Sequence, residues 1–122
     1  MGLQESGEMY LETILQLKQE NGKVRSIDIA TRMGYSKPSI SRAVHNLEAN
    51  GYVIFDTDGC ILLTEKGNEV AERTFKRHSI LTDFFTKLGV SPETAAEDAC
   101  RIEHVISEET FVAIKKHSDK VF

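Results

Sequence analysis

The chain has 122 residues, of which 40% are hydrophobic and 28% are charged. This balance is typical of one globular domain, or of two small ones, and it excludes a disordered chain. No apolar run approaches the about 20 residues that a membrane-spanning helix needs, so no transmembrane segment is predicted. The N-terminus lacks the basic flank and apolar stretch of a secretory signal, and the two cysteines, Cys60 and Cys100, are far apart. We therefore expect a cytoplasmic protein with reduced thiols.

The net charge is −4, but the charges are unevenly distributed. Residues 22–46 contain five basic side chains and one acidic side chain, so the rest of the chain is strongly acidic. A basic segment in an acidic chain is typical of a DNA-binding face on a body that self-associates or binds a ligand. A basic surface that only faces solvent would give the same count, and charge alone does not separate the two.

Three helices are predicted in the first part of the chain. Apolar residues recur there at helical spacing, and each segment is followed by a stop signal. Ser26 is the expected N-cap of the second helix, and a short turn through Gly34 separates the second helix from the third. The predicted ranges are 5–20, 26–33 and 38–50.

A hairpin and further helices are predicted next. Two short β-rich runs flank the turn signal Asp58-Gly59, which predicts a β-hairpin over residues 52–63. The remaining chain returns to helical periodicity. The helices predicted there run from Thr64 to about Leu88, from Ser91 to near Ile106, and from Ser107 toward Lys116.

The order of these elements predicts a fold class. Two short helices joined by a turn and followed by a two-stranded hairpin make a winged helix-turn-helix, whose second helix enters the major groove of DNA. We therefore predict a mainly α protein, with a winged-helix DNA-binding domain at residues 1–63 and a helical domain at residues 64–122.

The outward face of the 38–50 helix is suited to DNA. On a helical wheel Arg42 lies opposite the apolar stripe, among small and polar residues. Arg42 can pair with guanine through two hydrogen bonds, and the serine hydroxyls can donate to phosphates or base edges. Lys37 and the cations of the preceding loop can neutralise phosphates. A polar surface helix is the alternative. The predicted DNA-binding residues are Lys23, Arg25, Ser36, Lys37, Pro38, Ser39, Ser41, Arg42 and Asn46.

Metal-ligating residue types recur at helical spacing in the helix that starts at Ser91. Cys100, Glu103 and His104 are spaced i, i+3 and i+4, which places a thiol, a carboxylate and an imidazole on one face beside the apolar stripe. Together these donors suit a divalent transition metal. A lone cysteine is more often a small core residue, and a lone Glu-His pair is more often solvated, so the interpretation depends on all three.

Two other helices carry further candidates. Met9 lies off the apolar stripe of the first helix, with Glu12 one turn away. A role as thioether ligand would explain that position, and so would a contact with another subunit. His78 lies in the middle of the apolar face of the 64–88 helix. A core histidine is the usual interpretation of such a position, but near a metal it would be a ligand.

Three segments occur in this order along the chain: Glu8-Met9-Tyr10-Leu11-Glu12-Thr13-Ile14, Arg77-His78 and Ala99-Cys100-Arg101-Ile102-Glu103-His104-Val105. In these segments the sequence resembles the iron- and manganese-dependent repressors, the group of the diphtheria toxin repressor and the manganese transport regulator. The resemblance covers nearly the whole chain. It implies a homodimer with an N-terminal winged helix and a helical dimerisation domain, in which metal binding licenses binding to an operator.

The resemblance also implies a ligand set. Residues that match the regulatory site of the iron-dependent branch are Met9, Cys100, Glu103 and His104, and those that match positions of the manganese branch are Glu12 and His78. Thr82 and Ala96 stand where the iron branch has two ligands of an ancillary site, so that ancillary site is not expected. A second ion held by Glu12, His78 and a shared Glu103 is an alternative.

The sequence therefore predicts a metal-dependent transcriptional repressor of metal-ion homeostasis and not an enzyme. Thiolate and thioether donors favour Fe(II), with Mn(II) as the alternative and Zn(II), Co(II) or Ni(II) as surrogates in vitro. The expected partners are a palindromic double-stranded operator and a second copy of the chain, without a membrane. Two other classes stay open. One is a metal-independent winged-helix regulator that responds to a small organic ligand. The other is a metallohydrolase, although the chain has no His-Glu-x-x-His pattern.

Overall fold

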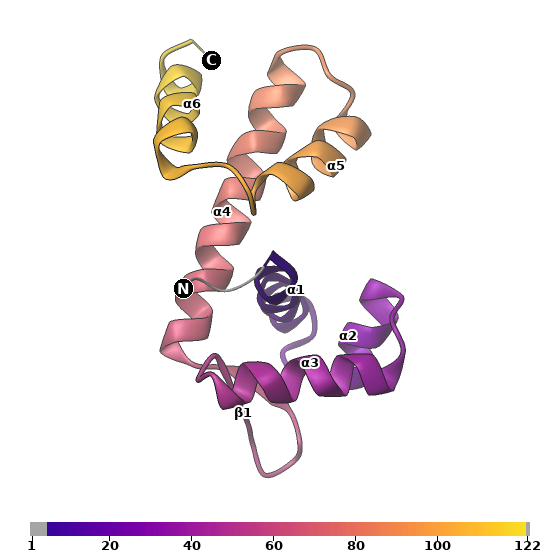
Figure 1. Cartoon of the computed structure of the whole chain (residues 1–122). Helices are drawn as coiled ribbons and strands as arrows, with labels where there is room; N and C mark the ends of the chain where they lie inside the picture. Colours follow the sequence, from indigo (N-terminus) through magenta and orange to yellow (C-terminus); the bar gives the residue numbers. More distant parts are fainter. Residues whose placement is uncertain (1–4, 122) are drawn as a thin grey trace. The chain divides into compact units, whose positions relative to one another are not determined.

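The structure is a computed structural model that describes residues 5–121. Within these residues the chain is mainly helical, with one two-stranded sheet (Figure 1). It divides into two compact units, one through Glu72 and one from Arg73, and each has its own hydrophobic core. The elements in order are α1 (Glu5–Asn21), α2 (Ser26–Met33), α3 (Lys37–Ala49), β1 (Val53–Phe55), β2 (Ile61–Leu63), α4 (Glu65–Lys87), α5 (Pro92–Ile102) and α6 (Glu108–Val121). Among the described helices, none combines the length and hydrophobicity needed to cross a bilayer.

In the first unit, α1, α2 and α3 pack around one apolar core. The core-facing side chains are fully buried, among them Ile14 of α1, Ile29 of α2 and Ile40 of α3. They recur at three- and four-residue spacing, so each helix turns one stripe inward and leaves its other faces to solvent. The predicted stripe of α3 is confirmed at Val44 and Leu47, both buried. The opposite, polar face of α3 is therefore outward.

The hairpin follows α3 and extends past it as a wing (Figure 1). Its strands are antiparallel, with Val53 opposite Leu63. Asp56 closes the turn, because one of its carboxylate oxygens accepts hydrogen bonds from the backbone N–H groups of Asp58 (2.9 Å) and Cys60 (2.8 Å). The N–H of Ile61 donates to the carbonyl of Val24 at 2.7 Å, which ties the wing to the segment before α2. The predicted winged helix-turn-helix is confirmed.

One predicted N-cap and one predicted helix start are shifted by one residue. The N-cap of α2 is Arg25 and not Ser26, because the Asp28 carboxylate accepts the backbone N–H of Arg25 at 2.8 Å. This bond is one half of a capping box, in which the third helical residue satisfies the N-cap N–H. Helix α3 begins at Lys37, one residue before the predicted start, and the hydroxyl of Ser36 caps it by accepting the N–H of Ser39.

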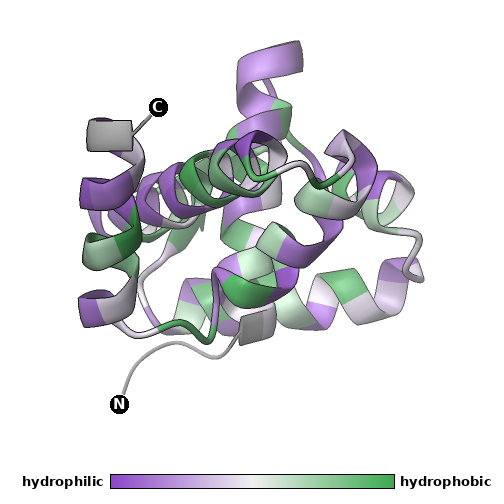
Figure 2. Cartoon of the chain, turned by 90° about the horizontal axis from the view of Figure 1, so that it is seen from above, coloured by the Kyte–Doolittle hydropathy of each residue, from purple (hydrophilic) through white to green (hydrophobic). Residues whose placement is uncertain are grey.

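In the second unit, the later turns of α4 pack with α5 and α6. Leu81, Ala99 and Phe111 form the buried centre, with one residue from each helix. Each helix carries both hydrophobic and hydrophilic faces, as Figure 2 shows by colour. Three amphipathic helices can therefore enclose this small core.

Helix α5 ends at Ile102, four residues earlier than predicted. The prediction followed apolar spacing, which continues through Ile106, but Val105 is 70% exposed. The N–H of Val105 bonds to the carbonyl of Ile102, three residues back, so the chain tightens into a turn. We call residues 103–106 the ligand turn. Arg77 of α4, which is distant in sequence, donates hydrogen bonds to the backbone of this turn.

Candidate metal centre and nucleic-acid interface

The second unit places two imidazoles against one carboxylate. The Nδ1 atom of His78 lies 3.1 Å from Oε2 of Glu103, and Nε2 of His104 lies 3.2 Å from the other oxygen, Oε1. The side chains of Glu103 and His104 have no exposed surface, and that of His78 is 27% exposed. Three of the six predicted metal ligands therefore lie together, although they are separated by up to 26 residues in sequence.

The backbone explains how these three side chains meet. His78 projects from α4, while Glu103 is the C-cap of α5, with φ −56° and ψ −27°, and His104 follows it in the ligand turn. The expectation that Cys100, Glu103 and His104 share one face of a continuous helix is therefore wrong for His104, because the helix has ended. Cys100 lies on α5 one turn before Glu103, and it is half-buried.

The residues that are present fit a divalent transition metal. Two imidazole nitrogens and two carboxylate oxygens converge in a setting with little solvent, and such donors bind Mn(II), Fe(II) or Zn(II). A carboxylate removed from water requires hydrogen-bonded or metal partners, since its burial is otherwise costly. A neutral imidazole can ligate through the same nitrogen that faces Glu103. This cluster is thus chemically able to hold a cation.

The other two predicted metal ligands belong to the first unit. Met9 and Glu12 lie on α1, where Met9 is half-buried and Glu12 is only 6% exposed. The carbonyl of Met9 accepts a hydrogen bond from the Thr13 hydroxyl at 2.8 Å, within the helix. Their role as ligands stays a prediction.

Arg77 is a residue of this centre that the predicted ligand set did not include. Its guanidinium donates to the backbone carbonyls of Glu103 and Ile106, at 3.3 Å each, and to the carboxylate of Glu108 at 2.6 Å. The side chain is only 14% exposed. A basic residue directly before the candidate ligand His78 was the available signal in the sequence. Nothing local could have shown that its partners lie 26 to 31 residues further on.

The predicted DNA-binding residues lie around the start of α3. Lys23 and Arg25 are exposed in the segment before α2, and Lys37, Pro38, Arg42 and Asn46 are exposed on α3. Ser39 and Ser41 are half-buried, and the Ser39 hydroxyl accepts from Arg42 at 3.5 Å, while Ser36 is the N-cap of α3. All of these residues belong to the first unit, and their contacts with DNA stay a prediction.

An aromatic contact links α1 to the turn before α3. The rings of Tyr10 and Tyr35 meet edge to face, with centroids 6.4 Å apart. Burial, and then the neighbouring phenol of Tyr35, raise the pKa of Tyr10 above its usual value. Tyr10 therefore stays neutral at physiological pH, and it lies directly between Met9 and Leu11 in the sequence.

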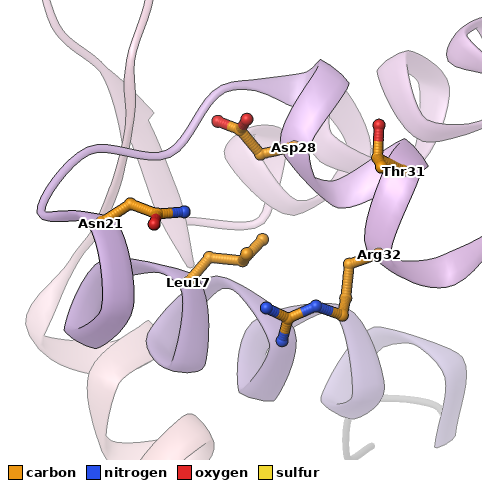
Figure 3. Close-up of a pocket in the computed structure, with 5 residues that line it drawn as sticks. All are labelled: Leu17, Asn21, Asp28, Thr31 and Arg32. Carbon is orange, nitrogen blue, oxygen red and sulfur yellow. The ribbon is translucent and has the colours of Figure 1, made fainter.

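The first unit also has a surface hollow of about 210 Å³ between α1 and α2. Leu17 and Asn21 line it from α1, and Asp28, Thr31 and Arg32 from α2 (Figure 3). Its charged groups already have protein partners. Asp28 accepts the N–H of Arg25, and Arg32 pairs with Glu20. The hollow therefore serves the packing of α1 on α2 rather than a separate ligand.

The chain joins a winged helix-turn-helix to a helical unit that carries a carboxylate–imidazole cluster. This combination defines a class of proteins, the metal-binding transcriptional regulators. Comparison with known families agrees with this. The description "Iron dependent repressor, N-terminal DNA binding domain" matches residues 2–60, and "Iron dependent repressor, metal binding and dimerisation domain" matches residues 64–121. The chain therefore belongs to the iron-dependent repressor family, whose members are metal-dependent transcriptional regulators and not enzymes.

Relatives with names or solved structures cover most of this chain. It is 36% identical over 111 residues to the transcriptional regulator MntR of Escherichia coli O6:H1, which is 91% of this chain and 72% of that protein. Among solved structures, the manganese regulator SloR has a TM-score of 0.82 at 27% identity, covering 98% of this chain and 55% of that one. A manganese-dependent transcriptional repressor in complex with manganese has a TM-score of 0.81 at 25% identity, covering 91% and 51%. This chain thus spans about half the length of the solved relatives.

Proposed function

We propose that this protein is a metal-dependent repressor that binds an operator as a homodimer and controls metal-ion homeostasis. The observation that carries the proposal is the pair of imidazole nitrogens within 3.2 Å of the buried carboxylate of Glu103. We assign DNA binding to residues 1–63, and metal binding and dimerisation to residues 64–122. The ranges matched by the two family descriptions support this division.

The proposed ligands come from both functional parts. When bound, the metal supplies a cross-link between side chains that are distant in sequence. Glu12 is included because its position matches the manganese branch of the family, and the residue is only 6% exposed. Cys100 supplies a soft donor one turn from Glu103. The full proposed set is Met9, Glu12, His78, Cys100, Glu103 and His104.

Two lines of argument rank the metals differently. The thiol of Cys100 and the thioether of Met9 favour Fe(II), since Mn(II) prefers oxygen and nitrogen. Two of the solved relatives are a manganese regulator and a manganese-dependent repressor. We propose Mn(II) as the first ion to test and Fe(II) as the second, which reverses the order expected from the sequence alone. Zn(II), Co(II) and Ni(II) are proposed as surrogates in vitro.

The proposed DNA partner is a palindromic duplex. Helix α3 enters the major groove with Arg42 toward the bases, while Lys23, Arg25 and Lys37 contact phosphates. A two-fold symmetric dimer then predicts half-sites about one helical turn, or a multiple of it, apart. Such a regulator acts where the chromosome is, which in a bacterial relative is the cytoplasm.

The test is metal-dependent retention of DNA by the full chain. Duplexes are first selected from a random pool on immobilised protein with Mn(II), and their affinity is then measured with Mn(II), with anaerobic Fe(II) and with chelator. We expect tight binding with metal and weak binding with chelator. Three substitutions of proposed ligands should each reduce the metal affinity. The reduction should be at least as large as that caused by loss of a residue that hydrogen-bonds to a ligand, which is roughly 10- to 100-fold. The three are Met9→Ala, Cys100→Ser and Glu103→Gln.

Glu97→Gln is the matched control for Glu103→Gln, because Glu97 is an exposed acid on the same helix. It should leave the metal requirement unchanged. If chelator leaves DNA binding of the wild-type chain intact, the metal-dependent mechanism is wrong, and the metal-independent regulator that answers an organic ligand is favoured instead.

A further inference from the structure

Arg77 holds the backbone of the ligand turn from a neighbouring helix. Its Nη1 atom donates to the carbonyls of Glu103 and Ile106, the first and last residues of that turn, at 3.3 Å each. The Glu103 carbonyl lies at the C-cap of α5, where backbone acceptors lack helical partners and carry the negative end of the helix dipole. A buried guanidinium is a strong donor for them.

Two further contacts orient the guanidinium itself. Its Nη2 atom donates to the carboxylate of Glu108 at 2.6 Å, and its carbon lies 5.2 Å from the centre of the Phe111 ring. Both partners are in α6, so one side chain of α4 joins the end of α5 to the start of α6. Glu108 also neutralises the cation. A guanidinium next to a metal centre would otherwise repel the bound ion.

Two consecutive residues of α4 therefore contact Glu103, one at its main chain and one at its side chain. Arg77 holds its main-chain carbonyl, and His78 faces its carboxylate at 3.1 Å. We propose that Arg77 is the positioning residue of the metal centre, which holds the ligand turn so that the side chains of Glu103 and His104 face His78. This inference rests on the proposed function. Arg77 contacts no metal in it and acts only through the ligands.

The contacts at position 77 require an arginine side chain and not simply a positive charge. Three acceptors are bonded through two nitrogens of one planar group, while the carbon of the group lies over an aromatic ring. A lysine ammonium is a compact charge without the rigid fork and the stacking plane. Arg77→Lys should therefore keep the charge but restore the positioning only in part.

The experiment measures metal binding by the full chain, without DNA. Free Mn(II) is followed by electron paramagnetic resonance, and the visible spectrum of the Co(II)-loaded protein reports the ligand geometry. We expect Arg77→Gln to weaken Mn(II) binding roughly 10- to 100-fold and to change the Co(II) spectrum, as loss of a supporting partner does. Arg77→Lys should fall between Arg77→Gln and the wild type. Glu108→Gln should weaken binding by less than Arg77→Gln.

Lys76→Gln is the control, because it removes the same charge from the exposed position next to Arg77 on α4. Thermal unfolding in chelator measures general destabilisation separately. If Arg77→Gln lowers the melting temperature but leaves the Mn(II) affinity and Co(II) spectrum as in wild type, Arg77 is merely structural and the inference is wrong. If the wild-type chain itself binds neither ion, the proposed function has failed and the inference falls with it.

Discussion

At the residue scale, the proposed function assigns two kinds of DNA contact to residues of α3. Arg42 is exposed, and one of its guanidinium nitrogens lies 3.5 Å from the Ser39 hydroxyl, so its fork is directed along the polar face. We expect Arg42→Ala to reduce the preference for a selected duplex over an unrelated one by about 1–3 kcal/mol, the value of a bidentate pair with guanine. Fluorescence anisotropy with labelled duplexes at fixed salt measures both affinities.

Lys37→Ala is the comparison for Arg42→Ala. Lys37 begins α3, where a side chain that contacts a phosphate adds affinity without reading sequence. Lys37→Ala should weaken binding to both duplexes about equally and reduce the slope of log K against log salt by about one. Unchanged discrimination in Arg42→Ala would show that α3 does not read bases through this residue.

Gly67 is a second position where one side chain decides the outcome. It lies in the first turns of α4, and a Cβ atom there would be 2.0 Å from the carbonyl oxygen of Tyr52, which precedes β1. In an open helix, Gly→Ala stabilises by roughly 0.5–1 kcal/mol. Because this contact is with backbone, we expect Gly67→Ala instead to lower the free energy of unfolding by about 1–3 kcal/mol, as other overpacked sites do.

Chemical denaturation monitored by circular dichroism measures this change. Glu69→Ala, at an exposed position of the same helix, is the control and should be nearly neutral. Stabilisation by Gly67→Ala would mean that α4 does not approach the hairpin this closely.

At the scale of elements, sequence patterns predicted what depends on local chemistry. The stripe of α3 and the Asp-Gly turn of the wing are determined within a few residues, so both were predicted within a residue of their observed positions. The cap of α2 was missed by one residue because Ser26 and Arg25 compete for it. The carboxylate of Asp28 decides in favour of Arg25.

The end of α5 could not be predicted in this way. Its apolar spacing continues through Ile106, and bonds from Arg77, donated across 26 and 29 residues, hold a turn there. The metal cluster likewise depends on contacts between residues that are distant in sequence. Residue types and spacing suggested Glu103 and His104 as ligands, but the approach of His78 from α4 is a tertiary fact. For His78 the prediction therefore depended on the resemblance to a family and not on helical periodicity.

At the scale of the whole molecule, the proposal requires that metal and DNA affect each other equally. If Mn(II) raises the affinity for the selected duplex by some factor, linkage demands that the duplex raise the affinity for Mn(II) by the same factor. Couplings of this kind are typically 1–3 kcal/mol, which is about 5- to 150-fold. We expect the two factors to agree within error when anisotropy measures the first and the resonance signal of free Mn(II) measures the second.

The controls distinguish this coupling from simpler effects. An unrelated duplex of equal length should change the Mn(II) affinity much less than the selected one, because contacts with phosphates alone favour the metal-bound form less strongly. Glu103→Gln should abolish both factors together, since it removes the side chain on which the cluster depends. If Mn(II) tightens DNA binding while the selected duplex leaves the Mn(II) affinity of the protein unchanged, then the metal acts outside this equilibrium, for example on the duplex itself. The proposed site would then not be the switch.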